Sequence, residues 1–154
     1  MIQDEIYNTK IGKQYIESLN HNFHKMYVEK STLMAGLGDI AGKKVLDLAC
    51  GDGYYSRLMS SIGAKEVLGI DSSIQMIENA RQQEYPKRNG SLAYKLANVI
   101  GYDESKEYFD IVTTQYLFPY AKTKEELQQM IVTAYNTLKP GGMFVGVTTW
   151  SGGK

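Results

Sequence analysis

The stretch VLDLACGDG, residues 45–53, decides the fold of this chain. Val45–Ala49 is a short apolar run, typical of a strand buried on both faces, and it ends at a turn that contains Gly51 and Gly53. Glycine suits such a turn because its backbone adopts φ > 0 without strain and because no Cβ blocks an approaching ligand. The same glycines also fit a plain connection between a strand and a helix, so the meaning of the turn depends on its surroundings.

Strands and helices alternate along the rest of the chain. Apolar runs predict strands at Glu66–Ile70, Leu92–Leu96, Phe109–Thr114 and Met143–Thr149, and helical periodicity predicts helices at Tyr54–Ile62, about Ser73–Glu84 and residues 123–138. In the last helix the expected buried face comprises Leu127, Met130, Ile131, Ala134, Tyr135 and Leu138, and Pro140-Gly141-Gly142 is expected to break the helix. This alternation predicts an α/β fold with a parallel sheet, helices on both faces and a ligand site at the carboxyl edge.

We interpret residues 1–40 as an N-terminal helical lid and residues 41–154 as the core domain. The apolar positions from Met1 to about Gly38 have the periodicity of two helices, and the pattern changes to short strands after Gly42. We expect the lid helices to close over a ligand, with Tyr7 or Tyr15 against it.

Composition narrows the partners of this 154-residue chain, which is long enough for one compact domain. Lysine plus arginine balances aspartate plus glutamate at 17 each, so no basic field favours nucleic acid or anionic lipid. Cys50 is the only cysteine, which excludes an intrachain disulfide and a cysteine-rich metal site and fits a reducing cytoplasm. The first 30 residues lack the pattern of a signal peptide, and no apolar run approaches the roughly 20 residues of a membrane span.

A second acid follows the next predicted strand. Asp71 ends the run Val67–Ile70, 18 positions after Gly53. In a parallel nucleotide-binding sheet, a carboxylate at this place accepts hydrogen bonds from both ribose hydroxyls. The alternative role for Asp71 is the N-cap of the following helix, although Ser72 or Ser73 also suits that role.

Together, VLDLACGDG and VLGIDSSIQMIENAR (residues 67–81) resemble motif I and its successor in class I S-adenosylmethionine (SAM) dependent methyltransferases. The resemblance extends from about Gly42 to Thr149 and is closest to the small-molecule branch, similar to ubiquinone/menaquinone-type and toxoflavin-type enzymes. It implies a Rossmann-like doubly wound parallel sheet with five strands in the order 3-2-1-4-5. It also implies SAM as cofactor, S-adenosylhomocysteine as its product, and a small-molecule methyl acceptor.

The resemblance assigns cofactor-binding roles along the predicted carboxyl edge. Asp47 would orient the methionyl ammonium, directly or through water, and Asp71 would bind ribose. An aspartate of the family that accepts from the adenine amino group is replaced by Asn98, whose amide oxygen still accepts that bond without the charge. The further expected cofactor contacts are Ala49, Cys50, Gly51, Gly53, Ser72, Met76, Ala97, Val99, Gln115 and Tyr116; Ala49 stands where glycine is commoner, and Cys50 is a small filler.

A dinucleotide-dependent oxidoreductase is the rival interpretation, because Gly51–Ser56 approaches the pattern G-x-G-x-x-G/A. Tyr55 and Ser56 stand where that pattern needs a small residue, and Asp47 would face the pyrophosphate as a like charge. SAM carries an ammonium and no phosphate, so it suits the loop better.

Methyl transfer needs alignment of the acceptor and exclusion of water, and an acidic acceptor also benefits from a nearby base. The candidates for such a base are Tyr7, Tyr15, His21, His24, Tyr116 and Tyr120, each of which also fits a surface or packing role. No metal site is expected.

The family fold has two further strands, which complete the substrate site, whereas this sequence ends at Lys154 just after the fifth predicted strand. We therefore expect an unpaired apolar edge on that strand and a tendency to self-associate through it. A SAM-binding module without turnover is the alternative function.

Overall fold

Five strands form one parallel sheet in the order β3-β2-β1-β4-β5, as predicted. The computed structural model describes residues 24–83 and 90–148. The strands are β1 (Lys44–Leu48), β2 (Glu66–Asp71), β3 (Ser91–Leu96), β4 (Phe109–Gln115) and β5 (Leu138–Val147). The helices are η1 (a π-helix, His24–Glu29), α3 (Lys30–Leu37), α4 (Tyr54–Ser61), α5 (Ile74–Gln82), η2 (a short 3-10 helix, Phe118–Tyr120) and α6 (Lys124–Thr137).

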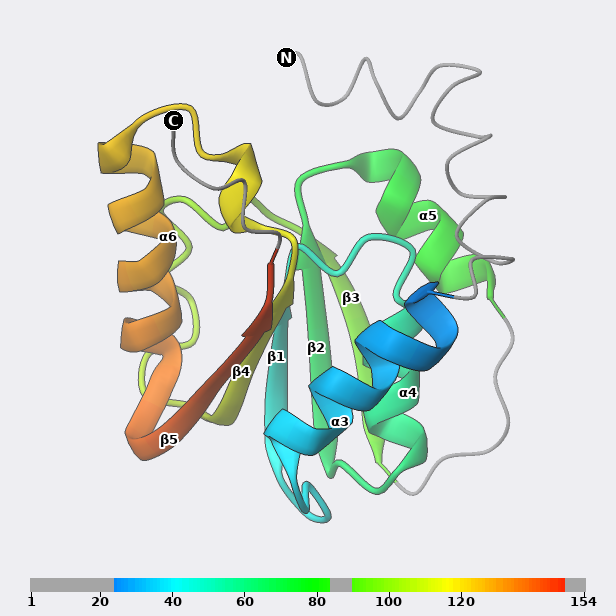
Figure 1. Ribbon diagram of the computed structural model, residues 1–154. Helices are drawn as coiled ribbons and strands as arrows, with labels where there is room; N and C mark the ends of the chain where they lie inside the picture. The colour runs from blue at the N-terminus through cyan, green and yellow to red at the C-terminus, as the bar shows by residue number, and fades with distance from the viewer. Residues whose placement is uncertain (1–23, 84–89, 149–154) are drawn as a thin grey trace.

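Helices cover both faces of the sheet, so the doubly wound architecture is confirmed. Figure 1 shows α3, α4 and α5 on one side and α6 on the other. Successive residues of β1 face opposite sides: Val45 packs in a core with α3 and α4, and Leu46 packs in a core with α6. The apolar run of β1 is therefore continuous because both of its faces are buried.

The end of the predicted lid packs against the sheet. Leu33 and Leu37 of α3, with Ile40, are buried in the same cluster as Val45. A Cβ on Gly36 would lie 2.9 Å from the Val145 side chain, so α3 comes close to β5 because this residue has no side chain. Tyr7, Tyr15 and His21, all candidates for the base, lie outside the described residues.

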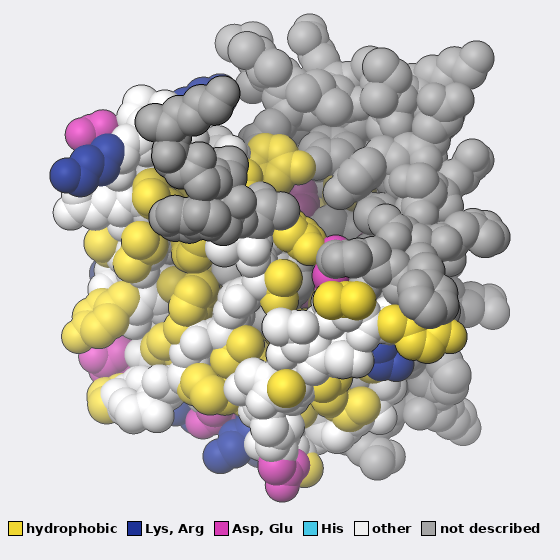
Figure 2. All heavy atoms as spheres, in the orientation of Figure 1, with side chains coloured by type: hydrophobic (Ala, Val, Ile, Leu, Met, Phe, Trp, Pro, Cys, Tyr) yellow, Lys and Arg dark blue, Asp and Glu magenta, His cyan; other side chains and the backbone are white. Residues whose placement is uncertain are grey.

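The predicted buried face of α6 is partly wrong. Met130 and Ala134 are buried, but Ile131 is 50% exposed and Tyr135 is 77% exposed. Thr133 faces the core instead. Its hydroxyl can be buried because it donates a hydrogen bond to the Val99 carbonyl oxygen at 2.7 Å. A threonine whose hydroxyl is hydrogen-bonded can occupy a core position like an apolar residue. The periodicity of apolar side chains does not mark such a position. The exposed side chains contribute to the apolar surface over α6 and β5 that is visible in Figure 2.

The predicted start of the last strand is also wrong. The helix ends at Thr137, but β5 begins at once at Leu138, five residues before the predicted start at Met143, and includes the Pro140-Gly141-Gly142 segment that is expected to break the helix. The pairing with β4 shifts register there, and Gly141 has φ of 79°. Proline and a left-handed glycine are tolerated at this place because β5 is an edge strand with an irregularity.

Candidate functional site

The loop after β1 is built from alternating left-handed residues. Ala49, Gly51 and Gly53 have φ of 58°, 56° and 75°. The loop starts as an extension of the sheet, since the Cys50 N–H donates to the Ile70 carbonyl oxygen at 2.9 Å. A Cβ on Gly51 would meet no atom within 4 Å, so this side of the loop is open to a ligand. Ala49 adopts a left-handed conformation that favours glycine.

Asp71 at the end of β2 links this loop to the next helix. One carboxylate oxygen accepts from the Gly51 N–H and the other from the Ser73 N–H, both at 2.9 Å. The N-cap of α5 is Ser73, one of the two serines considered for it, because its hydroxyl accepts from the Met76 N–H at 3.4 Å. Asp71 is therefore not the cap, and its half-buried carboxylate lies beside the open face of Gly51.

Asp47 lies beneath the loop in the middle of the sheet. Its carboxylate is fully buried and accepts a short hydrogen bond of 2.5 Å from the Ser56 hydroxyl on α4. Burial, together with the nearby carboxylates of Asp47 and Asp71, raises the pKa of the Cys50 thiol well above its usual value. The carboxylates of Asp47 and Asp71 therefore lie close to the loop, where they suit an ammonium better than a pyrophosphate.

Two side chains that the sequence did not single out support the loop from the α4/α5 side. The Arg57 guanidinium donates to the Asp52 carbonyl oxygen at 2.6 Å, and the Tyr94 hydroxyl donates to the Gly53 carbonyl oxygen at 3.3 Å. A Cβ on Gly53 would collide with the Tyr94 ring, so this glycine is required by packing within the protein.

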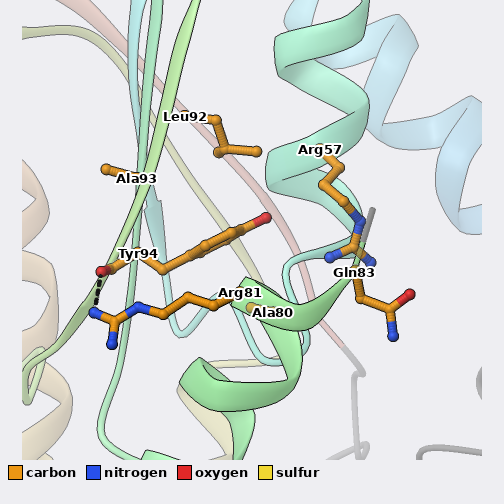
Figure 3. Close-up of a pocket in the computed structure, with 7 residues that line it drawn as sticks. All are labelled: Arg57, Ala80, Arg81, Gln83, Leu92, Ala93 and Tyr94. Carbon is orange, nitrogen blue, oxygen red and sulfur yellow. Dashed lines mark hydrogen bonds between the residues drawn. The ribbon is translucent and has the colours of Figure 1, made fainter. Parts of the chain in front are cut away.

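Arg57 and Tyr94 also line a pocket between α4, α5 and β3 (Figure 3). Burial raises the pKa of Tyr94 to about 12. At the outer edge of β3, Arg81 donates to the Tyr94 carbonyl oxygen at 2.8 Å. This contact occupies one acceptor of the β3 edge, a feature that discourages pairing with another strand.

Tyr116 follows β4 in a left-handed conformation, with φ of 60°. Its hydroxyl donates to one oxygen of Glu29 at 2.6 Å, and the Tyr55 hydroxyl donates to the other at 2.9 Å. Burial and this contact with Glu29 raise the pKa of Tyr55. Sequence reasoning missed Glu29, because a single acid between the predicted helices carries no recognisable pattern. Only the three-dimensional contact identifies it.

The other expected site residues occupy varied environments. Asn98 is exposed, and its side-chain oxygen accepts from the Ile100 N–H at 2.9 Å; the Ala97 N–H donates to the Asp71 carbonyl oxygen at 2.9 Å. Met76 and Val99 are buried in the core, whereas Ser72 and Tyr120 are exposed. Gln115 donates to the Thr113 hydroxyl at 2.7 Å. His24 is the first residue of η1.

Within residues 24–83 and 90–148, no group of three or more His, Cys, Asp or Glu side chains is arranged to hold a metal ion. The helices of these segments include none with the length and apolar character needed to cross a bilayer.

Comparison with known proteins identifies the family. A family model described as a methyltransferase domain matches residues 45–142, well over half of the chain. The chain therefore belongs to the class I SAM-dependent methyltransferases, and it is homologous to ubiquinone and menaquinone methyltransferases. The resemblance seen in residues 45–53 and 67–81 is confirmed.

Individual relatives agree with this family. The chain is 28% identical over 149 residues to a demethylmenaquinone methyltransferase from Lactococcus lactis, covering 94% of this chain and 57% of the relative. It is 30% identical over 109 residues to a ubiquinone biosynthesis O-methyltransferase from Neisseria meningitidis, covering 70% of this chain and 44% of the relative. The solved structure of a SAM-dependent methyltransferase from Mesorhizobium loti superposes with a TM-score of 0.68 at 28% identity, covering 78% of this chain and 52% of that chain. The chain thus spans about half the length of the curated relatives it matches.

Proposed function

We propose that this protein binds SAM in the crevice formed by the loop after β1 and the end of β2, and transfers its methyl group to a small molecule. The observation that carries this proposal is the Asp71 carboxylate beside the open face of Gly51, in an environment made negative by Asp47. Each oxygen of Asp71 accepts one backbone N–H, and carboxylate oxygens can accept more than one hydrogen bond, which suits a ribose diol. SAM carries no phosphate, so no negatively charged phosphate of the cofactor has to approach the buried Asp47 carboxylate.

The residues present fit the cofactor. Asp71 would hold the ribose, Gly51 would leave room for the amino acid portion, and the buried Asp47 would attract the ammonium, directly or through water. Asn98 would accept from the adenine amino group. When bound, SAM supplies a methyl group activated on a sulfonium. The protein then has to orient the acceptor and exclude water. We assign the second task to residues 1–40, as a lid over the crevice.

A small-molecule acceptor is supported by the balanced charge and by the names of two relatives, a demethylmenaquinone methyltransferase and a ubiquinone biosynthesis O-methyltransferase. Among the candidates for a base, Tyr116 lies at the carboxyl edge of β4, the edge that also carries the cofactor crevice. Tyr7, Tyr15, His21, His24 and Tyr120 remain candidates on sequence grounds. Because the chain spans about half of its relatives, transfer by this chain alone is part of the proposal.

The test is incubation with methyl-labelled SAM and, in separate reactions, a small-metabolite extract, total RNA and total protein. Label in the metabolite fraction alone supports the proposal. Label in RNA or protein would show that the methyl acceptor is a macromolecule and not a small molecule. SAM binding without transfer in any fraction would favour the alternative of a binding module without turnover. Calorimetric titration with NAD addresses the rival oxidoreductase function, since NAD binding without SAM binding would overturn the methyltransferase proposal.

A further inference from the structure

Glu29 joins three parts of the chain that are far apart in sequence. It is the last residue of η1, and its two carboxylate oxygens accept the hydroxyls of Tyr55, 26 positions away, and Tyr116, 87 positions away. Tyr55 lies in α4, directly after the cofactor loop, and Tyr116 lies directly after β4. We name this group the Glu29 clasp, comprising Glu29, Tyr55 and Tyr116.

Both hydrogen bonds of the clasp are of a strong kind. Each is an O–H donor on an ionised carboxylate, and such bonds are shorter and stronger than those between neutral groups. Tyr55 is only 5% exposed, so its hydroxyl depends on a partner inside the protein. Loss of the carboxylate therefore removes an acceptor from the hydroxyl of a largely buried tyrosine.

The clasp also accounts for the unusual backbone of Tyr116. A bulky residue with positive φ persists only where its surroundings hold it. Here the Tyr116 N–H donates to the Val147 carbonyl oxygen at 2.8 Å, and the hydroxyl at the far end of the side chain donates to Glu29. The backbone N–H and the side-chain hydroxyl of Tyr116 therefore both hold the left-handed turn after β4 in place.

We infer that Glu29 is a positioning residue of the cofactor crevice. Its two hydrogen bonds fix η1, α4 and the turn after β4 relative to one another. The inference rests on the proposed function, because it assigns the clasp to the SAM crevice. Its consequence is that less of the SAM binding free energy is spent on positioning η1 against α4 and the turn after β4.

The test compares Glu29→Gln with Glu66→Gln in the full chain. Glu66 is a matched control, because it accepts a tyrosine hydroxyl in the same way, from Tyr108 at 2.9 Å, but lies at the start of β2, at the opposite edge of the sheet. Two quantities are measured: the dissociation constant for S-adenosylhomocysteine by calorimetry, and the hydrogen exchange of backbone amides in residues 24–37 by mass spectrometry.

Glu29→Gln should raise the dissociation constant about tenfold, the change expected for loss of one charge-assisted hydrogen bond. It should also speed exchange in residues 24–37 by a similar factor, whereas Glu66→Gln changes neither quantity more than about twofold. Equal effects of the two substitutions on both quantities would overturn the inference. So would faster exchange with unchanged affinity, because the clasp would then hold the fold and not the crevice.

Tyr55→Phe and Tyr116→Phe provide a second route should Glu29→Gln fail to fold. Each keeps the carboxylate and removes one hydrogen bond, so each should show an effect comparable to that of Glu29→Gln, and the double variant, which removes both bonds, should show a larger one. A double variant that behaves like wild type overturns the inference. Wild-type protein that does not bind S-adenosylhomocysteine refutes the proposed function, while the exchange measurement still shows whether the clasp anchors residues 24–37.

Discussion

The carboxylate of Asp71 accepts a hydrogen bond of 2.9 Å from the backbone N–H of Gly51, a residue 20 positions earlier in the chain. The acid proposed to hold the ribose therefore also holds the glycine loop, before any ligand binds. The two functions are compatible because a carboxylate has about four acceptor positions. A substitution at Asp71 should consequently affect both cofactor affinity and stability.

Asp71→Asn should weaken SAM binding by at least about tenfold, because the amide oxygen and nitrogen cannot accept two ribose hydroxyls and two backbone N–H groups. Calorimetric titration measures this. Asp39→Asn is the matched control, since Asp39 accepts the N–H of Ala41, two residues on, at 2.9 Å, just as Asp71 accepts that of Ser73. Unchanged SAM affinity in Asp71→Asn would show that Asp71 does not bind the ribose.

Ala49→Gly should stabilise the folded protein by up to about 1 kcal/mol in urea denaturation. The left-handed conformation at φ 58° costs alanine roughly 1–2 kcal/mol, and the greater flexibility of glycine in the unfolded chain offsets part of the gain. Ala121→Gly, at a position with φ of −65°, should destabilise the protein instead. Destabilisation by both substitutions would show that Ala49 is not strained.

Cys50 should react slowly with a thiol reagent in the native protein at pH 7 to 8. Its pKa is raised by burial and by Asp47, so the reactive thiolate forms only at pH well above the usual thiol range. The unfolded chain loses this proton at a lower pH than the folded protein, so the free energy of unfolding falls as pH rises above the usual pKa of a thiol. Because Cys50 is the only cysteine, labelling in urea gives the full signal. Rapid native labelling would contradict the buried position.

Much of this architecture could be predicted from sequence because strands buried on both faces leave continuous apolar runs. Residues 45–53 and Asp71 also signal the loop and the acid directly, since glycine spacing reflects backbone conformation. The buried face of α6 could not be predicted, because the burial of Thr133 depends on a hydrogen bond to the Val99 carbonyl oxygen, 34 residues away. The start of β5 could not be predicted, because Pro140 is tolerated only since β5 is an edge strand. Glu29, Arg57 and Tyr94 escaped notice because their roles depend on contacts across the fold.

The outer edge of β5 should promote self-association, as expected from its place at the end of the sheet order. Exposed apolar side chains lie on it and on the adjoining α6, namely Ile131, Val132, Tyr135, Met143 and Phe144. Sedimentation should show an average mass that rises with concentration, and Phe144→Lys should reduce this rise, because a charge on an edge strand opposes pairing. A monomer at all concentrations would contradict the prediction.

The crystal structure of the complex with S-adenosylhomocysteine tests the central claim most directly. We expect both ribose hydroxyls within hydrogen-bond distance of Asp71, the amino acid portion over Gly51, and the ammonium on the side of Asp47. A crevice that stays empty at saturating ligand, or a bound ligand whose ribose lies away from Asp71, would contradict the assignment of this crevice as the SAM site.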